Sequence, residues 1–79
     1  MANLDRITFL RSIMGGQACI RGMRIPVSMI VNLVAHDKSF DAILEEYPDL
    51  ELADIHAALN YAAWLARDEV YPAVSVGNP

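Results

Sequence analysis

Two closely spaced arginines are the residues whose chemistry stands out in this chain. Arg21 and Arg24 lie three residues apart within the glycine-rich span 15–27, and Arg6 precedes them in the same basic segment. A guanidinium group can form two parallel hydrogen bonds with a carboxylate, and it also recognises phosphate. Arg6, Arg21 and Arg24 are therefore the candidate residues for contact with a protein partner or with nucleic acid.

The same arginines have a structural alternative. Arg21, Arg24 or both can brace the fold by binding backbone carbonyls or an acidic residue such as Asp54 or Glu46. A bracing arginine stabilises the chain and contributes nothing directly to partner binding. The sequence leaves both interpretations open.

Residues of the kinds that act in enzymes are scattered along the chain. His36, His56 and Cys19 lack the spacing of metal ligands, and Cys19 has no evident base beside it. Glu45 and Glu46 are adjacent, so on a helix they point to different sides and do not form a carboxylate pair. We therefore expect no catalytic residues, no metal and no cofactor, and predict that the protein is not an enzyme.

Charge and composition restrict the partners and the cellular location that are expected for this chain. Residues 1–36 hold four arginines and one aspartate, whereas residues 37–79 hold two basic and nine acidic residues, giving local charges of +3 and −7 and a formal net charge of −4. The acidic half is unsuited to lying on nucleic acid. With one cysteine and no run of about 18 apolar residues, a single cytoplasmic domain without membrane contact is expected. Because 54% of so short a chain is hydrophobic, we also expect a homodimer.

The first third of the chain predicts a β arm or hairpin over residues 5–25. Asp5–Phe9 alternates as a strand does, Gly15-Gly16 supplies a turn, and Cys19–Arg21 supplies a second short strand. An isolated two-stranded hairpin is marginal in water, so it must pack on helices or on a partner.

Three helices are predicted over residues 26–68. The first begins at Pro26, Ser39 caps the second, and Pro48 ends the second. The third begins between Asp49 and Glu51 and runs to Arg67 or Asp68. Its expected buried stripe contains Leu52, Ile55, Leu59 and Ala62. Residues 69–79 are expected to form an extended tail, and the whole is a mainly α, single-domain, helix-turn-helix bundle.

Several motifs in order resemble one known family. These motifs are Arg6-Ile7-Thr8, Gly15-Gly16, Ile20–Val27, Ile43–Leu50 and Asp54–Ala63. Together they resemble the bacterial domain of unknown function 433 family, whose members are regarded as VapB-like antitoxins. The resemblance implies a homeodomain-like helix-turn-helix preceded by a β arm. Here His36 stands where the family often has a helix-ending glycine, and Glu51 occupies a usual threonine cap, which we expect to weaken the start of the third helix.

The resemblance also implies a function, since members are often encoded beside a PIN-like ribonuclease toxin. The first hypothesis is an antitoxin that neutralises such a toxin, with Arg21 and Arg24 pairing to its acidic residues, and that also represses its own operon. The second is a dimeric DNA-binding regulator without a toxin partner, and the third is a non-enzymatic protein-interaction adaptor. The acidic start of the third helix disfavours direct base reading, because recognition helices present Arg, Lys, Asn or Gln to bases.

Overall fold

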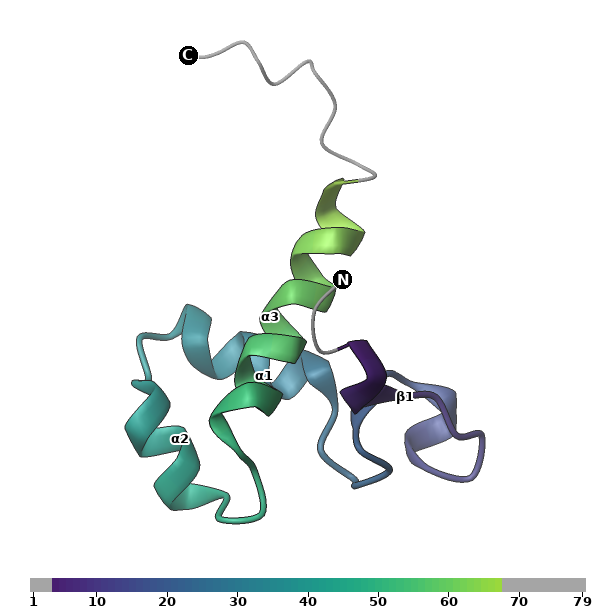
Figure 1. Cartoon of the computed structure of the whole chain (residues 1–79), viewed down its shortest axis with the longest axis horizontal. Coiled ribbons are helices and arrows are strands. Elements are labelled where there is room, and N and C mark those ends of the chain that lie inside the picture. Colours follow the sequence, from purple (N-terminus) through teal and green to yellow (C-terminus); the bar gives the residue numbers. More distant parts are fainter. Residues whose placement is uncertain (1–3, 68–79) are drawn as a thin grey trace, which may run out of the picture.

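The computed structural model describes residues 4–67, in which a short N-terminal hairpin packs against three helices (Figure 1). The predicted mainly α fold with an N-terminal β hairpin is confirmed. The tail predicted over 69–79 lies outside the described residues. In chain order the elements are η1 (Leu4–Arg6), β1 (Ile7–Thr8), η2 (Met14–Gly16), β2 (Cys19–Ile20), α1 (Val27–Ala35), α2 (Phe40–Glu46) and α3 (Leu52–Arg67).

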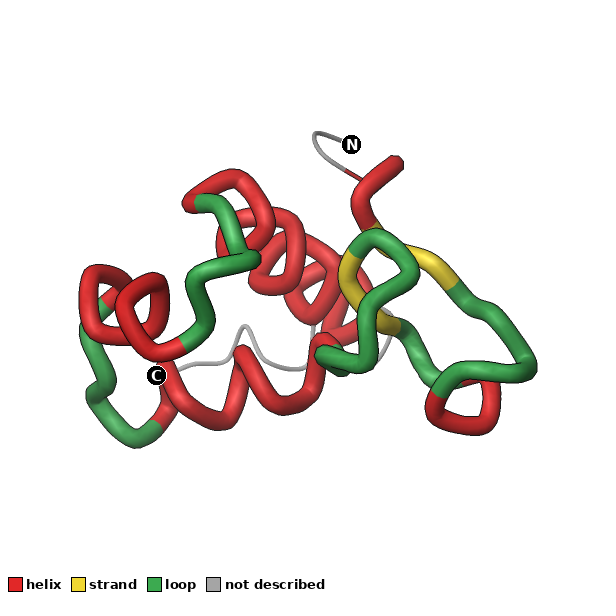
Figure 2. The backbone as a smooth tube through the Cα atoms, turned by 90° about the horizontal axis from the view of Figure 1, so that it is seen from below, coloured by secondary structure: helices red, strands yellow, loops and turns green. Residues whose placement is uncertain are grey.

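The hairpin is antiparallel, with Ile7 opposite Ile20 and Thr8 opposite Cys19. Both strands are shorter than predicted, because residues 4–6 form a 3-10 turn and the chain leaves β2 at Arg21. Figure 2 shows the two strands side by side at one end of the molecule, joined by the loop that contains η2. The turn predicted at Gly15-Gly16 is confirmed within η2.

Strand β2 ends in a tight left-handed turn. Arg21 (φ 43°) and Gly22 (φ 74°) both have positive φ, and the Met23 N–H donates to the Ile20 carbonyl at 2.7 Å. Glycine adopts this conformation readily, whereas an arginine there is strained. The Thr8 hydroxyl accepts a hydrogen bond from the Gly22 N–H at 2.8 Å. The hairpin therefore holds the turn, and the turn sets the direction of the Arg21 side chain.

Helix α1 begins at Val27, one residue after the predicted start at Pro26, which is its N-cap. The helix ends at Ala35, and His36 is its C-cap. The chain then reverses at Asp37, whose φ of 68° is left-handed. The Asp37 N–H donates to the Val34 carbonyl and the Lys38 N–H donates to the Leu33 carbonyl, each at 3.0 Å. This pair of bonds is the Schellman motif, in which the left-handed position usually carries glycine. Asp37, one residue after His36, thus occupies the left-handed position in which glycine is usual.

Helix α2 follows its predicted boundaries. The Ser39 hydroxyl accepts a hydrogen bond from the Ala42 N–H at 3.1 Å, which confirms the predicted N-cap. The helix stops at Glu46, just before Tyr47-Pro48, since proline disfavours helical geometry in the residue before it. A turn then leads into α3, which continues to Arg67, the last of the described residues.

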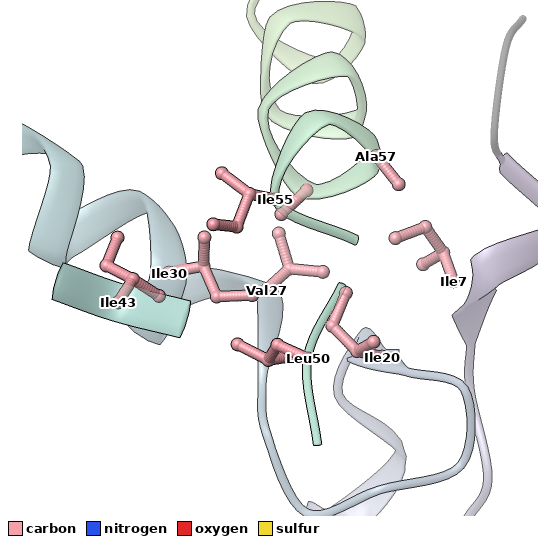
Figure 3. Packing of buried hydrophobic residues seen from close by; sticks show 9 residues of the cluster. Ile7, Ile20, Val27, Ile30, Ile43, Leu50, Ile55 and Ala57 are labelled. Carbon is pink, nitrogen blue, oxygen red and sulfur yellow. The ribbon is translucent and has the colours of Figure 1, made fainter. Parts of the chain in front are cut away.

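Every major element contributes to one small core (Figure 3). The hairpin supplies Ile7 and Ile20, α1 supplies Val27 and Ile30, α2 supplies Ile43, the following turn supplies Leu50, and α3 supplies Ile55, Ala57 and Ala58. The core is built largely from isoleucines and alanines, so α3 can approach α1 and the hairpin closely.

The predicted buried stripe of α3 is wrong at its first residue. Leu52 is 47% exposed, whereas Leu50, in the turn before the helix, is buried. The buried face is centred on Asp54 and Ala58, so it is rotated away from Leu52. The sequence pattern misplaced it because an aspartate is normally a surface residue.

Candidate functional site

Asp54, on the first turn of α3, is fully buried and makes hydrogen bonds through both carboxylate oxygens. Arg21 forms a fork on it, with Nε 3.0 Å from Oδ1 and Nη2 2.7 Å from Oδ2. Arg6 Nη1 donates to Oδ1 at 2.8 Å, and the Glu51 N–H donates to Oδ2 at 2.8 Å. We call Arg6, Arg21, Glu51 and Asp54 the Asp54 cluster.

The cluster ties the N-terminal arm to the start of α3. Arg21 Nη2 also donates to the Asp49 carbonyl at 2.9 Å, and Arg6 Nη1 donates to Glu51 Oε1 at 2.8 Å. The bracing alternative for Arg21, with Asp54 as its partner, is confirmed. Arg6, which was predicted only to contact a partner, braces the fold in the same way.

The electrostatics of the cluster follow from burial and pairing. Burial of Asp54 by itself would raise its pKa, but the hydrogen bonds from Arg21, Arg6 and the Glu51 N–H outweigh burial and lower the pKa to about 2. The same bonds to Asp54 raise the pKa of Arg21 and, together with Glu51, that of Arg6. The carboxylate is therefore charged at neutral pH, and its negative charge is offset by the two guanidinium groups.

Asp54 also begins the helix on which it lies. Its carboxylate reaches back three residues to the Glu51 N–H, which is one half of a capping box. Such a bond satisfies a backbone donor that an α-helix leaves free at its N-terminus. The start of α3, expected to be weak because Glu51 replaces a threonine, is stabilised in this way by Asp54.

Arg24 is separate from the cluster. It lies in the exposed turn between β2 and α1, and within residues 4–67 no hydrogen bond or ion pair involves its side chain. The three predicted contact residues therefore divide into two arginines held by Asp54 and one exposed arginine. The role of all three in partner contact stays a prediction.

Three aromatic side chains form a second feature, which we call the aromatic patch. Phe9 meets Tyr61 edge-on at 5.9 Å between ring centroids, and Tyr61 stacks on Trp64 at 6.2 Å. With Ile7 they line a hollow of about 270 Å³. Phe9 and Trp64 remain 56% and 43% exposed. No local pattern in the sequence indicates that Phe9 contacts Tyr61, because 52 positions lie between the two residues in the chain.

An open groove lies on the α1 side of the C-terminal half of α3. It encloses about 520 Å³, and none of its lining residues is charged. We call it the α1–α3 groove; it is lined by Gln17, Ala18, Val27, Ser28, Val31, Asn32, Ala35, Tyr61, Ala62 and Leu65. Nothing in the sequence pattern marked it, because its walls come from three separate segments.

The histidines and the cysteine lie apart from one another. His36 Nδ1 is 2.8 Å from the Asn32 carbonyl oxygen, His56 packs edge-on against Phe40, and Cys19 is buried. Among residues 4–67, no three His, Cys, Asp or Glu side chains come close enough together to hold a metal ion. In that same part of the chain, no helix has both the length and the apolar character needed to cross a membrane.

Comparison with known proteins places the chain in a family. Residues 7–62, well over half of the chain, match the family described as "Protein of unknown function (DUF433)". No curated protein and no solved structure matches the chain. The matched span covers both hairpin strands, all of α1 and α2, and α3 as far as Ala62. The chain therefore belongs to the DUF433 family.

Proposed function

We propose that this protein is a non-enzymatic antitoxin that binds and neutralises a PIN-like ribonuclease toxin. The observation that carries the proposal is the aromatic patch. Aromatic residues are enriched in the energetically important centres of protein interfaces, where they lose contact with water on binding. The resemblance to VapB-like antitoxins supplies the class of partner.

The patch has the form of a preorganised binding surface. Tyr61 is held between Phe9 and Trp64, so its ring has little freedom left to lose on binding. The hollow beside it is open, and its walls are almost entirely apolar. An apolar side chain of a partner would bury the exposed faces of Phe9 and Trp64 together.

Arg24 is the residue we propose for contact with the acidic centre of the toxin. Arg6 and Arg21 already pair with Asp54, and freeing either would leave a buried carboxylate without its partner. Arg24 carries no such cost, because its side chain has no partner within residues 4–67. Its guanidinium can form the forked bonds to carboxylate that a metal-holding acidic cluster would accept.

Binding to the toxin should depend on the aromatic patch. We expect Trp64→Ala to weaken binding at least about tenfold, since it removes a large exposed contact. Leu52→Ala is the matched control, because Leu52 is equally exposed on α3 but lies outside the patch. The measurement is titration calorimetry with the product of the neighbouring reading frame, the expected place of a PIN-like ribonuclease gene. If both variants bind the ribonuclease with the same affinity, the aromatic patch is not the contact surface. If the natural chain does not bind it at all, the proposed function is wrong.

Neutralisation should depend on Arg24. We expect Arg24→Ala to abolish rescue of cells that express the toxin, while its helical circular dichroism stays unchanged because the side chain braces nothing within residues 4–67. Arg24→Lys should recover only part of the rescue, since lysine cannot form the fork. Full rescue by Arg24→Ala would assign the contact with the toxin to other residues.

DNA binding is a second candidate, favoured by the order α2, turn, α3 and by the exposed Arg24 near the hairpin. Glu51 and Asp54 lie at the start of α3, so contact would have to come through the arm rather than through α3. Gel-shift assays with the chain's own promoter should then show binding that falls steeply with salt. No shift at low salt would exclude autorepression by the free protein.

A further inference from the structure

The buried face of α3 continues past the end of the core. Asp54 and Ala58 lie on this face and are buried, and Ala62 and Leu65 follow them at helical spacing on the same side. Figure 1 shows the C-terminal half of α3 rising beyond the other helices and the hairpin. Leu65 is 45% exposed there, so within residues 4–67 an inward-facing apolar surface is left uncovered.

The α1–α3 groove is the hollow beside that uncovered face. Ala62 and Leu65 form its α3 side, and Val31 and Ala35 form part of its α1 side. Small residues on both helices leave room for a further helix to approach closely. Leu65 is both a wall of the groove and an exposed apolar side chain that could enter an identical groove.

The distribution of charged residues indicates which helix can occupy the α1–α3 groove. From Ile55 to Ala66, α3 carries no Asp, Glu, Lys or Arg, although the chain as a whole has a net charge of −4. Two copies would repel each other through the acidic residues of α2 and its following turn. Those residues lie at the opposite end of the molecule from the C-terminal end of α3 (Figure 1). The span 55–66 is thus an uncharged surface on which two copies can meet, with Arg67, Asp68 and Glu69 following it in the sequence.

We propose that the α1–α3 groove of one chain receives the C-terminal half of α3 from a second copy. The contact is isologous, so Leu65 of each copy enters the groove of the other. Each Leu65 then loses its exposed surface, and Ala62 lies close to the two-fold axis. This inference does not depend on the proposed toxin, because it rests on α3 and its groove alone.

The size of the surface sets the strength of the dimer. Interfaces of standard size use about 20–30 residues on each side, and the groove has far fewer lining residues than that. The dimer is therefore expected to be reversible and to dissociate on dilution. The contact is apolar, so its stability should change little with salt.

Sedimentation of the full 79-residue chain tests the proposal. Between about 5 and about 500 µM, the mass should rise from the monomer value of 8.7 kDa towards twice that value. Leu65→Glu should raise the dissociation constant at least about tenfold, because it places a charge in an apolar contact. Ala63→Glu is the control, since Ala63 is exposed on the same helix but lines neither hollow.

Three results would overturn the proposal. The first is a natural chain that stays monomeric across the whole range. The second is a dimer that Leu65→Glu leaves intact, and the third is a dimer that Ala63→Glu and Leu65→Glu weaken equally. Circular dichroism of both variants checks that α3 remains helical. A monomer that still binds the ribonuclease would reject the dimer and leave the proposed function standing.

Discussion

The carboxylate of Asp54 has three structural roles. It accepts the Arg21 fork, accepts a bond from Arg6, and caps the helix through the Glu51 N–H. A buried charge is costly unless it is paired and fully hydrogen-bonded, and here both oxygens have partners. The net effect favours the charged form, as the lowered pKa of Asp54 records.

Stability should therefore fall in acid. The pKa of Asp54 is about 2 in the folded chain, below the ordinary aspartate value of 3.8. A depressed carboxyl pKa contributes stability that is fully present above the unfolded value and is lost as the pH falls towards the folded value. The expected contribution of this group is about 2 kcal/mol, lost between about pH 5 and pH 2. Urea unfolding across that range measures it.

Asp54→Asn is the variant that isolates this effect. It should lower the free energy of unfolding at pH 7 and flatten its dependence on pH below about 5, because the titrating group is gone. Glu45→Gln is the control, since it removes one exposed acidic charge and should leave the acid-dependent loss in place. An unchanged slope in Asp54→Asn would assign the acid sensitivity to other carboxyls.

At the scale of elements, each helix boundary has its own local cause. Ser39 caps α2 with its hydroxyl, Pro48 follows the end of α2, and Asp54 caps α3 from inside the helix. The end of α1 is the strained boundary, because Asp37 occupies a left-handed position that glycine usually holds. An acidic side chain at a helix C-terminus is also unfavourable to the helix dipole.

Asp37→Gly should therefore stabilise the protein. Glycine relieves the strain at φ 68° and removes the unfavourable charge, and its greater freedom in the unfolded chain offsets part of the gain. The expected increase in the free energy of unfolding is about 0.5–1 kcal/mol. Asp37→Asn separates the two causes, because it removes the charge and keeps a side chain. A destabilised glycine variant, measured by thermal or urea unfolding, would contradict this account.

At the scale of the whole molecule, the basic arm and the acidic helices are joined through their charges. The hairpin meets the helices through the apolar side chains of Ile7 and Ile20 (Figure 3). It also meets them through the ion pairs of the Asp54 cluster. The positive and negative parts of the chain therefore partly neutralise each other inside one fold. The exposed features include the acidic α2 end, Arg24 and the two apolar surfaces along α3.

Removing one arginine of the Asp54 cluster should weaken the contact between the hairpin and the helices. We expect Arg21→Ala to destabilise the chain more than Arg6→Ala, because Arg21 forms the fork and also binds the Asp49 carbonyl. Either loss leaves the buried carboxylate with fewer partners. Hydrogen exchange should show faster exchange in the hairpin amides and in the first turn of α3. If the two variants destabilise the chain equally, Arg21 contributes no more to stability than Arg6 does.

The sequence by itself determined the order of elements, most boundaries and the family. Periodicity and local signals such as Pro26, Ser39 and Pro48 act over a few residues, so they can be read without a fold. Only the tertiary structure decided which arginines are bound and where the apolar surfaces lie. Arg21 meets Asp54 across 33 positions and Phe9 meets Tyr61 across 52, and contacts at such distances depend on packing that no local pattern encodes.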